Sequence, residues 1–103
     1  MEHRIFAVLR ENGKNNSYLF PTRDAYHEAA FSPETEVAAV HPLAVRGRTY
    51  RARQNSLREL AIAVQGDDEG GLSQGELADL QTFFAENGRK LGLLREFREN
   101  AIC

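Results

Sequence analysis

The chain of 103 residues has no tryptophan and only one cysteine, Cys103, so no disulfide can form within it. Long apolar runs are also missing: the longest, Ile5–Leu9, has five residues, against the roughly 18–20 that a membrane-spanning helix needs. The first residues do not combine a basic region with an apolar stretch, as a secretory signal does. Cys103 is not four residues from the end, as prenylation requires. We therefore expect a cytoplasmic protein with no membrane partner.

The sequence also lacks the common catalytic and metal-binding motifs. The three histidines are scattered, and His27 is followed by Phe31 where a zinc-protease helix needs a second histidine. The glycines within residues 66–75 are not followed by the lysine and hydroxyl residue of a phosphate-binding loop. The acids from Asp67 onward miss the spacing of a calcium-binding EF-hand. We therefore predict no catalytic residue, no metal site and no cofactor, and we expect a protein that is not an enzyme.

Length and composition indicate one globular domain. Apolar residues make up 42% of the chain and charged residues 27%. A chain of this length can bury roughly 60–65% of its unfolded surface, which is enough for one core. We predict a single domain over residues 1–103, with mainly strands and one short helix in residues 1–48 and helices in residues 49–103.

The beginning of the chain is typical of a β-hairpin. Arg4–Leu9 is rich in β-forming residues and apolar on both faces, which predicts a central strand. Asn12-Gly13 predicts a tight turn, because both of its central positions need a positive φ. We expect residues 14–16 to lengthen this loop, and the second strand to run over Ser17–Phe20.

A short helix and a third strand follow in the prediction. Thr22 is placed to cap a helix over Arg23–Phe31. Glu36–His41 reads as a strand that carries two valines, and Pro42 after it favours an edge strand or a bulge.

The second half predicts helices with clear start signals. Thr49 is a candidate cap for a helix over Tyr50–Gln65, and Ser73 and Glu76 have capping-box spacing. The helix that starts near Gln74 can end at Asn87 or continue to Leu91 with Gly92 as the left-handed residue, and the sequence leaves both open. A last helix is expected over Leu93–Asn100.

Strands followed by helices predict an α+β fold, with a small antiparallel sheet of three to four strands packed against two to three C-terminal helices. The predicted core consists of Ile5, Phe6, Val8, Leu19, Phe20, Val37, Val40, Leu57, Leu60, Val64, Leu77, Leu80, Phe84, Leu91, Leu94 and Phe97.

The net charge of −2 hides an uneven distribution along the chain. Residues 46–58 contain five arginines and no acid, whereas residues 59–88 contain seven acids and no basic residue. Arginines in the first turn of the expected helix lie at its partly positive end, at a cost of about 0.3–1 kcal/mol each, and choices that oppose the fold tend to mark function. The candidate anion-binding or nucleic-acid-binding residues are Arg46, Arg48, Arg51, Arg53 and Arg58. The alternative is that the acids of residues 59–88 fold back and neutralise them.

The acidic segment has its own two interpretations. Asp67, Asp68 and Glu69 lie in an expected flexible loop and are candidates for a protein-binding surface. A solvated loop, with acids near the favourable positive end of the next helix, explains the same residues.

Parts of the second half resemble a known group of proteins. Residues 47–50, followed by Leu57–Ile62, and the closing run Gly88–Ile102 look like segments of small uncharacterised proteins carried by bacterial phages and conjugative elements. Those proteins have no established activity, so the resemblance assigns no catalytic residue. It implies an accessory protein of a mobile element in a bacterial cytoplasm, where such proteins often bind a host or element factor.

These observations lead to two functional hypotheses. The first is a non-enzymatic interaction protein that binds a protein partner as a regulator or inhibitor. The second is a nucleic-acid-binding module that uses the basic segment 46–58. The two differ in whether the basic segment is exposed and unpaired or packed against the acids.

Overall fold

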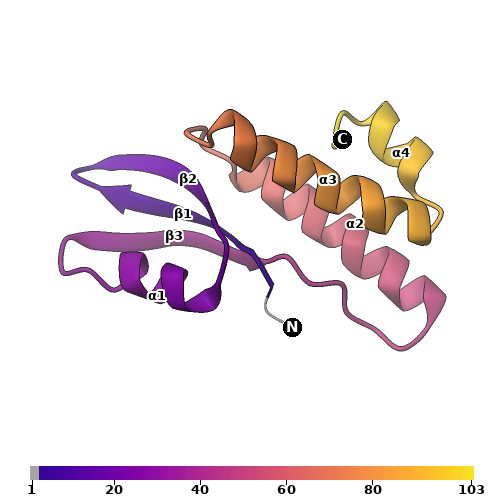
Figure 1. Ribbon diagram of the computed structural model, residues 1–103, viewed down its shortest axis with the longest axis horizontal. Helices are drawn as coiled ribbons and strands as arrows, with labels where there is room; N and C mark the ends of the chain where they lie inside the picture. The colour runs from indigo at the N-terminus through magenta and orange to yellow at the C-terminus, as the bar shows by residue number, and fades with distance from the viewer. Residues whose placement is uncertain (1–2) are drawn as a thin grey trace.

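A computed structural model of the chain describes residues 3–103 and shows a sheet beside a group of helices (Figure 1). The elements in chain order are β1 (Ile5–Glu11), β2 (Lys14–Phe20), α1 (Arg23–Ala30), β3 (Thr35–Pro42), α2 (Tyr50–Asp67), α3 (Gln74–Lys90) and α4 (Leu94–Glu99). The strands pair antiparallel in the order β2-β1-β3. The α+β class predicted from the sequence is confirmed.

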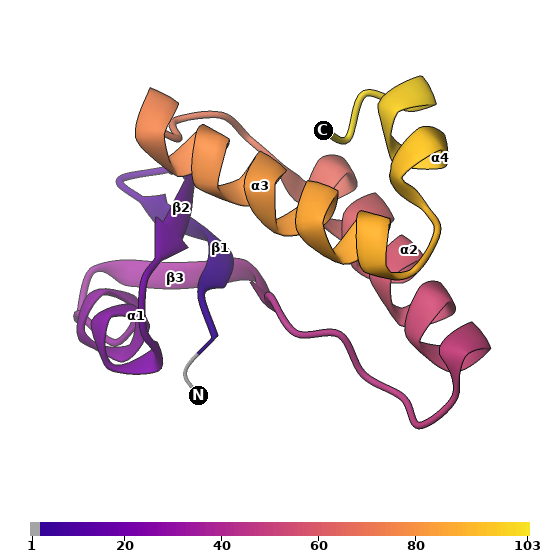
Figure 2. The same cartoon turned by 45° about the vertical axis from the view of Figure 1, so that its right-hand side comes forward.

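Strand β1 lies in the centre of the sheet and is buried on both faces. Phe6 and Val8 pack into a core shared with α2, α3 and α4, which we call the helix-side core. Ile5, Ala7 and Leu9 pack into a smaller core under α1. Figures 1 and 2 show α1 on one face of the sheet and the hairpin of α2 and α3 on the other. The central position predicted for this strand is confirmed, and its apolar residues on both faces are covered by two layers of helices.

The hairpin between β1 and β2 is as tight as two residues allow. Asn12 and Gly13 have φ values of 54° and 77°, which fits a turn with two left-handed central residues. Lys14 already pairs with Glu11, so the expectation that residues 14–16 lengthen the loop is wrong. Residues of mixed polarity can extend a hairpin in this way because the turn fixes the register.

Strand β3 is an edge strand with a bulge, as Pro42 indicated. Val8 pairs with Ala39 and Leu9 with Val37, so one extra residue is inserted between them. Val37 and Val40, predicted to lie in the core, remain 40% and 39% exposed. The reason is that the core under α1 is built from β1, β2 and α1, and β3 contributes nothing to it.

The helix starts are those that the sequence predicted. The Thr49 hydroxyl accepts a hydrogen bond from the Ala52 amide at 3.0 Å, which caps α2. Ser73 and Glu76 form the expected reciprocal capping box at the start of α3. Helix α3 continues through Gly88 to Lys90, so the longer of the two predicted ends is confirmed. Gly92 follows with a φ of 70°.

Other expected core residues are more exposed than the spacing predicted. Leu77 is 43% exposed because α3 buries a stripe that begins at Leu80 and continues through Phe84 to Gly88. The residues of the predicted core that are half-buried are Phe20, Leu60 and Leu94.

Two glycines provide a matched test of this backbone. Gly47 has a φ of 119°, and a Cβ there would lie 2.8 Å from the Cβ of Ala52, whereas Gly66 lies in α2 with nothing within 4 Å of an added Cβ. We expect Gly47→Ala to lower the free energy of unfolding by about 1–3 kcal/mol. Gly66→Ala should raise it by up to about 1 kcal/mol through helix propensity. Urea unfolding monitored by circular dichroism measures both, and equal effects of the two changes would contradict this assignment.

Candidate interaction surfaces

The five arginines of residues 46–58 fall into two groups. Arg58 is half-buried, and its Nε and Nη2 donate to the two carboxylate oxygens of Glu96 at 2.9 and 3.2 Å. This hydrogen-bonded pair raises the pKa of Arg58 and lowers the pKa of Glu96 below its usual value. Arg58 therefore connects α2 to α4 and is occupied inside the fold.

The other four arginines are exposed around the start of α2. Within residues 3–103, none of them has a carboxylate close enough for an ion pair. The end of α3 lies beside them, because the Gln54 side chain donates to the Leu91 carbonyl at 2.7 Å, and it adds two exposed cations. We call this surface the basic end; its residues are Arg46, Arg48, Arg51, Arg53, Arg89 and Lys90.

Five of the seven acids of residues 59–88 lie toward the opposite end of the helical hairpin, whereas Glu59 lies in the middle of α2 and Glu86 lies one turn before Lys90 in α3. Asp67 pairs with His41 at 2.5 Å, and Asp79 lies 3.9 Å from Arg4. An α2 of 18 residues is about 27 Å long, several times the screening length of about 8 Å at physiological salt. Among residues 3–103, the acids of residues 59–88 do not fold back onto the arginines. Figure 1 shows α3 running back alongside α2, so the acids near the connection between these two helices are the ones far from the start of α2.

The acidic loop seals the outer edge of β2. The Ser17 amide donates to the Gly70 carbonyl at 2.7 Å, and the Ser17 hydroxyl donates to Asp68 at 2.6 Å. The Glu69 amide donates back to the Ser17 hydroxyl at 2.8 Å. Ser17 is only 1% exposed, and its polar groups are thus satisfied by the loop. Two of the three acids proposed for protein binding, at positions 67 and 68, therefore hold the loop against the sheet.

Glu76, in the first turn of α3, provides a second contact with the outer edge of β2. One carboxylate oxygen accepts the Ser73 amide at 3.0 Å, and the other accepts the Leu19 amide at 3.2 Å. The hydrogen bond from the Ser73 amide, supported by that from Leu19, lowers the pKa of Glu76. The outward amides of Ser17 and Leu19 are thus occupied, so a partner strand cannot pair with this half of β2.

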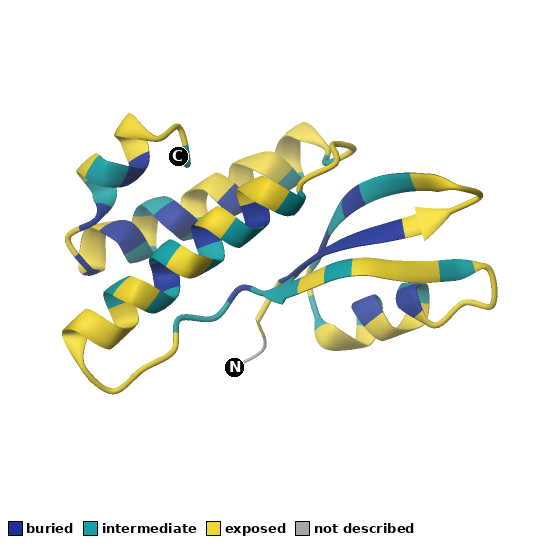
Figure 3. Cartoon of the chain, turned by 180° about the vertical axis from the view of Figure 1, so that it is seen from behind, coloured by how far each residue is buried: buried dark blue, intermediate teal, exposed yellow. Residues whose placement is uncertain are grey.

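The outer edge of β3 has no such cover. Within residues 3–103, no other backbone segment pairs with this strand on the side away from β1. Four of the eight residues of β3 are exposed, and Val37, Ala38 and Val40 are the apolar ones among them (Figure 3). An open edge that carries exposed β-branched residues is a template for pairing with another chain.

A groove continues from this edge along α2. It has a volume of about 290 Å³ and runs between the end of β3 and the middle of the helix. His41 and Pro42 form one wall, and Leu60 and Ala63 form the other, with Glu59 at its rim. The groove therefore gives an extended segment on β3 a place to continue.

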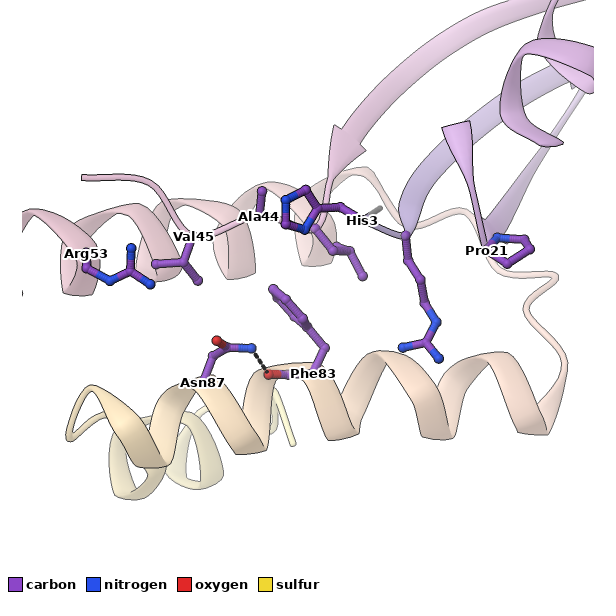
Figure 4. Close-up of a pocket in the computed structure, with 9 residues that line it drawn as sticks. His3, Pro21, Ala44, Val45, Arg53, Phe83 and Asn87 are labelled. Carbon is purple, nitrogen blue, oxygen red and sulfur yellow. Dashed lines mark hydrogen bonds between the residues drawn. The ribbon is translucent and has the colours of Figure 1, made fainter. Parts of the chain in front are cut away.

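A separate pocket of about 530 Å³ lies between the segment after β3 and helix α3 (Figure 4). Phe83 points from α3 toward Ala44 and Val45, and Arg53 and His3 lie at its margins. Of the residues proposed from the sequence, only Arg53 lines this pocket. The other lining residues were missed because five segments far apart in the sequence form the site, so no local spacing predicts it.

Neither a metal site nor a membrane span emerges from this geometry. In the part of the chain that the structure describes, no three histidine, cysteine, aspartate or glutamate side chains cluster to hold a metal ion. None of the helices described is both long enough and apolar enough to traverse a bilayer.

Comparison with models of protein families, with curated proteins and with solved structures finds no match for this chain. The resemblance to proteins of mobile elements therefore stays a prediction, and function has to be inferred from the surfaces themselves.

The seal on β2 predicts a pH dependence of stability. The pKa of Glu76 is lowered in the folded chain from its ordinary value of 4.5, so its contribution is present above that value and is lost as pH falls through the folded pKa. We expect Glu76→Gln to be less stable than the natural chain by about 1 kcal/mol at neutral pH. The difference should shrink below about pH 4.5.

Urea unfolding at a series of pH values measures this difference. Glu86→Gln, an exposed acid of the same helix, is the matched control and should show no comparable loss. A deficit in Glu76→Gln that stays constant from neutral to acidic pH would show that the carboxylate charge is not what closes the edge.

Proposed function

We propose that this chain is a non-enzymatic interaction protein that binds an extended segment of a protein partner along β3. The observation that carries the proposal is the difference between the two edges of the sheet. The β2 edge is closed by Gly70 and Glu76, whereas the β3 edge is open. In this binding mode main-chain hydrogen bonds give affinity, and side-chain pockets give specificity.

The surroundings of β3 define the chemistry of the partner segment. Val37 and Val40 pair with Leu9 and Ala7 of β1, so both valines share the face that α1 covers. A partner strand with β-branched or aromatic residues on that face would cover them. Its continuation would enter the groove beside α2, where Leu60 offers an apolar wall.

The setting of this function is part of the same proposal. The resemblance of the second half to proteins of phages and conjugative elements supports a bacterial cytoplasmic protein that regulates or inhibits a host or element factor. A closed edge and an open edge suit such a role, because one partner segment can pair without the sheet polymerising through both sides.

The β3 edge is tested with the double variant Val37→Lys, Val40→Lys. Because both side chains are already about 40% exposed, the variant should keep the fold and its melting temperature within a few degrees. Lysines on the edge should abolish capture of the partner from bacterial lysate. Hydrogen exchange of the natural complex should show protection of the amides in residues 35–42.

The matched control is Gln81→Lys, Thr82→Lys, which adds the same charge to an exposed part of α3. It should bind like the natural chain.

A partner that the β3 variant still captures, or protection elsewhere in the chain, would contradict the proposal. A dimer of the natural chain that the β3 variant converts to monomer would identify a second copy as the occupant. No partner and no self-association across repeated pull-downs would also count against it.

We propose nucleic-acid binding at the basic end as a second candidate function. The specific observation is that Arg46, Arg48, Arg51 and Arg53 are exposed and, among residues 3–103, carry no ion pair. Arginine forks bind phosphate in a bidentate manner. The overall charge of −2 limits this candidate, since the attraction comes from one end only.

The test is binding to mixed-sequence duplex DNA and single-stranded RNA over a range of salt. Arg48→Ala, Arg51→Ala should weaken binding and reduce the slope of log affinity against log salt by about 2. Arg95→Ala, Arg98→Ala removes the same charge from α4 and should leave the slope unchanged. Fluorescence anisotropy measures both variants. Absence of any binding at low salt would rule this candidate out.

A further inference from the structure

The pocket beside α3 is distinct from both proposed interaction surfaces in its chemistry. It lies at the meeting point of the start of β1, the segment after β3 and the second half of α3 (Figure 4). Its volume of about 530 Å³ falls within the range of about 300–1,000 Å³ that small-molecule sites occupy. The pocket is therefore large enough for a compound of one or two rings.

The lining combines an apolar interior with cations and no acid. Leu43 and Val45 on one side oppose Phe83 on the other, and Leu43 is only 2% exposed. Arg53 and Arg4 reach the pocket from different elements. Among residues 3–103, no carboxylate lines the pocket, and its charged lining groups are the two guanidinium groups.

The two arginines are not equally available. Arg4 forms a long ion pair with Asp79, in which the closest nitrogen and oxygen are 3.9 Å apart. Arg53 has no carboxylate within ion-pair distance among the residues from 3 to 103. Arg53 is thus the group best able to bind an anion.

Asn87 adds a neutral polar group at the same end. Its Nδ2 donates to the Phe83 carbonyl at 2.9 Å, which fixes the side-chain amide and leaves the amide oxygen as an acceptor. A ligand can therefore find a cation, an aromatic ring and one oriented oxygen within a single pocket.

We propose that this pocket binds a small organic anion with a flat apolar body, held by Arg53 at its charged group and by Phe83 along its body. Guanidinium binds carboxylate, sulfonate and phosphate oxygens through paired hydrogen bonds. The ring of Phe83 and the side chains of Leu43 and Val45 bury the apolar part. This site is independent of the partner segment on β3.

The probe for this site is anilinonaphthalene sulfonate, which combines a flat aromatic body with one anionic group and fluoresces when buried. We expect saturable binding to the natural chain. Arg53→Ala should weaken it by at least about tenfold, the loss expected for a charge-assisted hydrogen bond. Arg53 is exposed on α2, so this variant should fold. Arg53→Lys keeps the charge, so its affinity for the probe should lie between that of the natural chain and that of Arg53→Ala.

Controls separate the pocket from other apolar surfaces. Arg98→Ala removes the same charge from α4 and should bind the probe like the natural chain. The β3 variant Val37→Lys, Val40→Lys should also bind it normally. Displacement of the probe by phenyl phosphate or by phenylpropanoate then distinguishes a phosphate from a carboxylate as the preferred anion.

Two results would overturn the proposal. One is the absence of saturable binding to the natural chain. The other is equal binding by Arg53→Ala and Arg98→Ala, or a loss confined to the β3 variant, because the probe would then report another surface. A second variant, Phe83→Ala, should weaken binding as Arg53→Ala does, and its melting curve shows whether the fold is retained.

Discussion

The backbone hydrogen bonds at the two edges of the sheet are the constraint on which this structure depends. A three-stranded sheet has two outer rows of amides and carbonyls, and each buried group needs a partner. The chain satisfies the β2 edge with Ser17, the loop at Gly70 and the carboxylate of Glu76. Those bonds also position α3 over the sheet, so the seal joins the strand half of the chain to the helical half.

The placement of charge follows from the same seal. Acids near residues 67–76 lie at the sheet because their oxygens accept the loop and strand donors, and Asp67 meets His41 there. These acids lie at the end of α2 and the start of α3. The length of α2 therefore separates them from the exposed arginines around its start. The charge separation that is visible in the sequence is thus preserved in space. Of the five arginines of residues 46–58, only Arg58 forms an ion pair with an acid among residues 3–103, and its partner is Glu96 of α4.

Local features of the fold were predictable from the sequence, and long-range ones were not. Asn12-Gly13 and the Ser73–Glu76 capping box each satisfy their own backbone within four residues, so spacing alone decides them. The bonds from Ser17 to Asp68 and from Leu19 to Glu76 connect residues 51 and 57 apart, and no sequence pattern marks them.

The exposure of Val37 shows the same limit. Its residue type fits a strand, but its burial depends on which side chains α1 covers, and the core under α1 is formed by residues of β1, β2 and α1. The candidate sites divide in the same way. The exposed arginines follow from composition, whereas the pocket around Phe83 needs five segments brought together by the fold.

The open β3 edge and the basic end are adjacent along the chain. One partner can therefore contact both surfaces, and the salt dependence of its binding distinguishes them. The groove beside α2 begins at His41 and includes Arg46, the first residue of the basic end. A segment paired with β3 would therefore meet cations as it leaves the strand. Main-chain hydrogen bonds and apolar contacts weaken little with salt, whereas arginine–phosphate contacts weaken steeply. The salt dependence of binding thus reports which of the two surfaces holds the partner, even where one partner touches both.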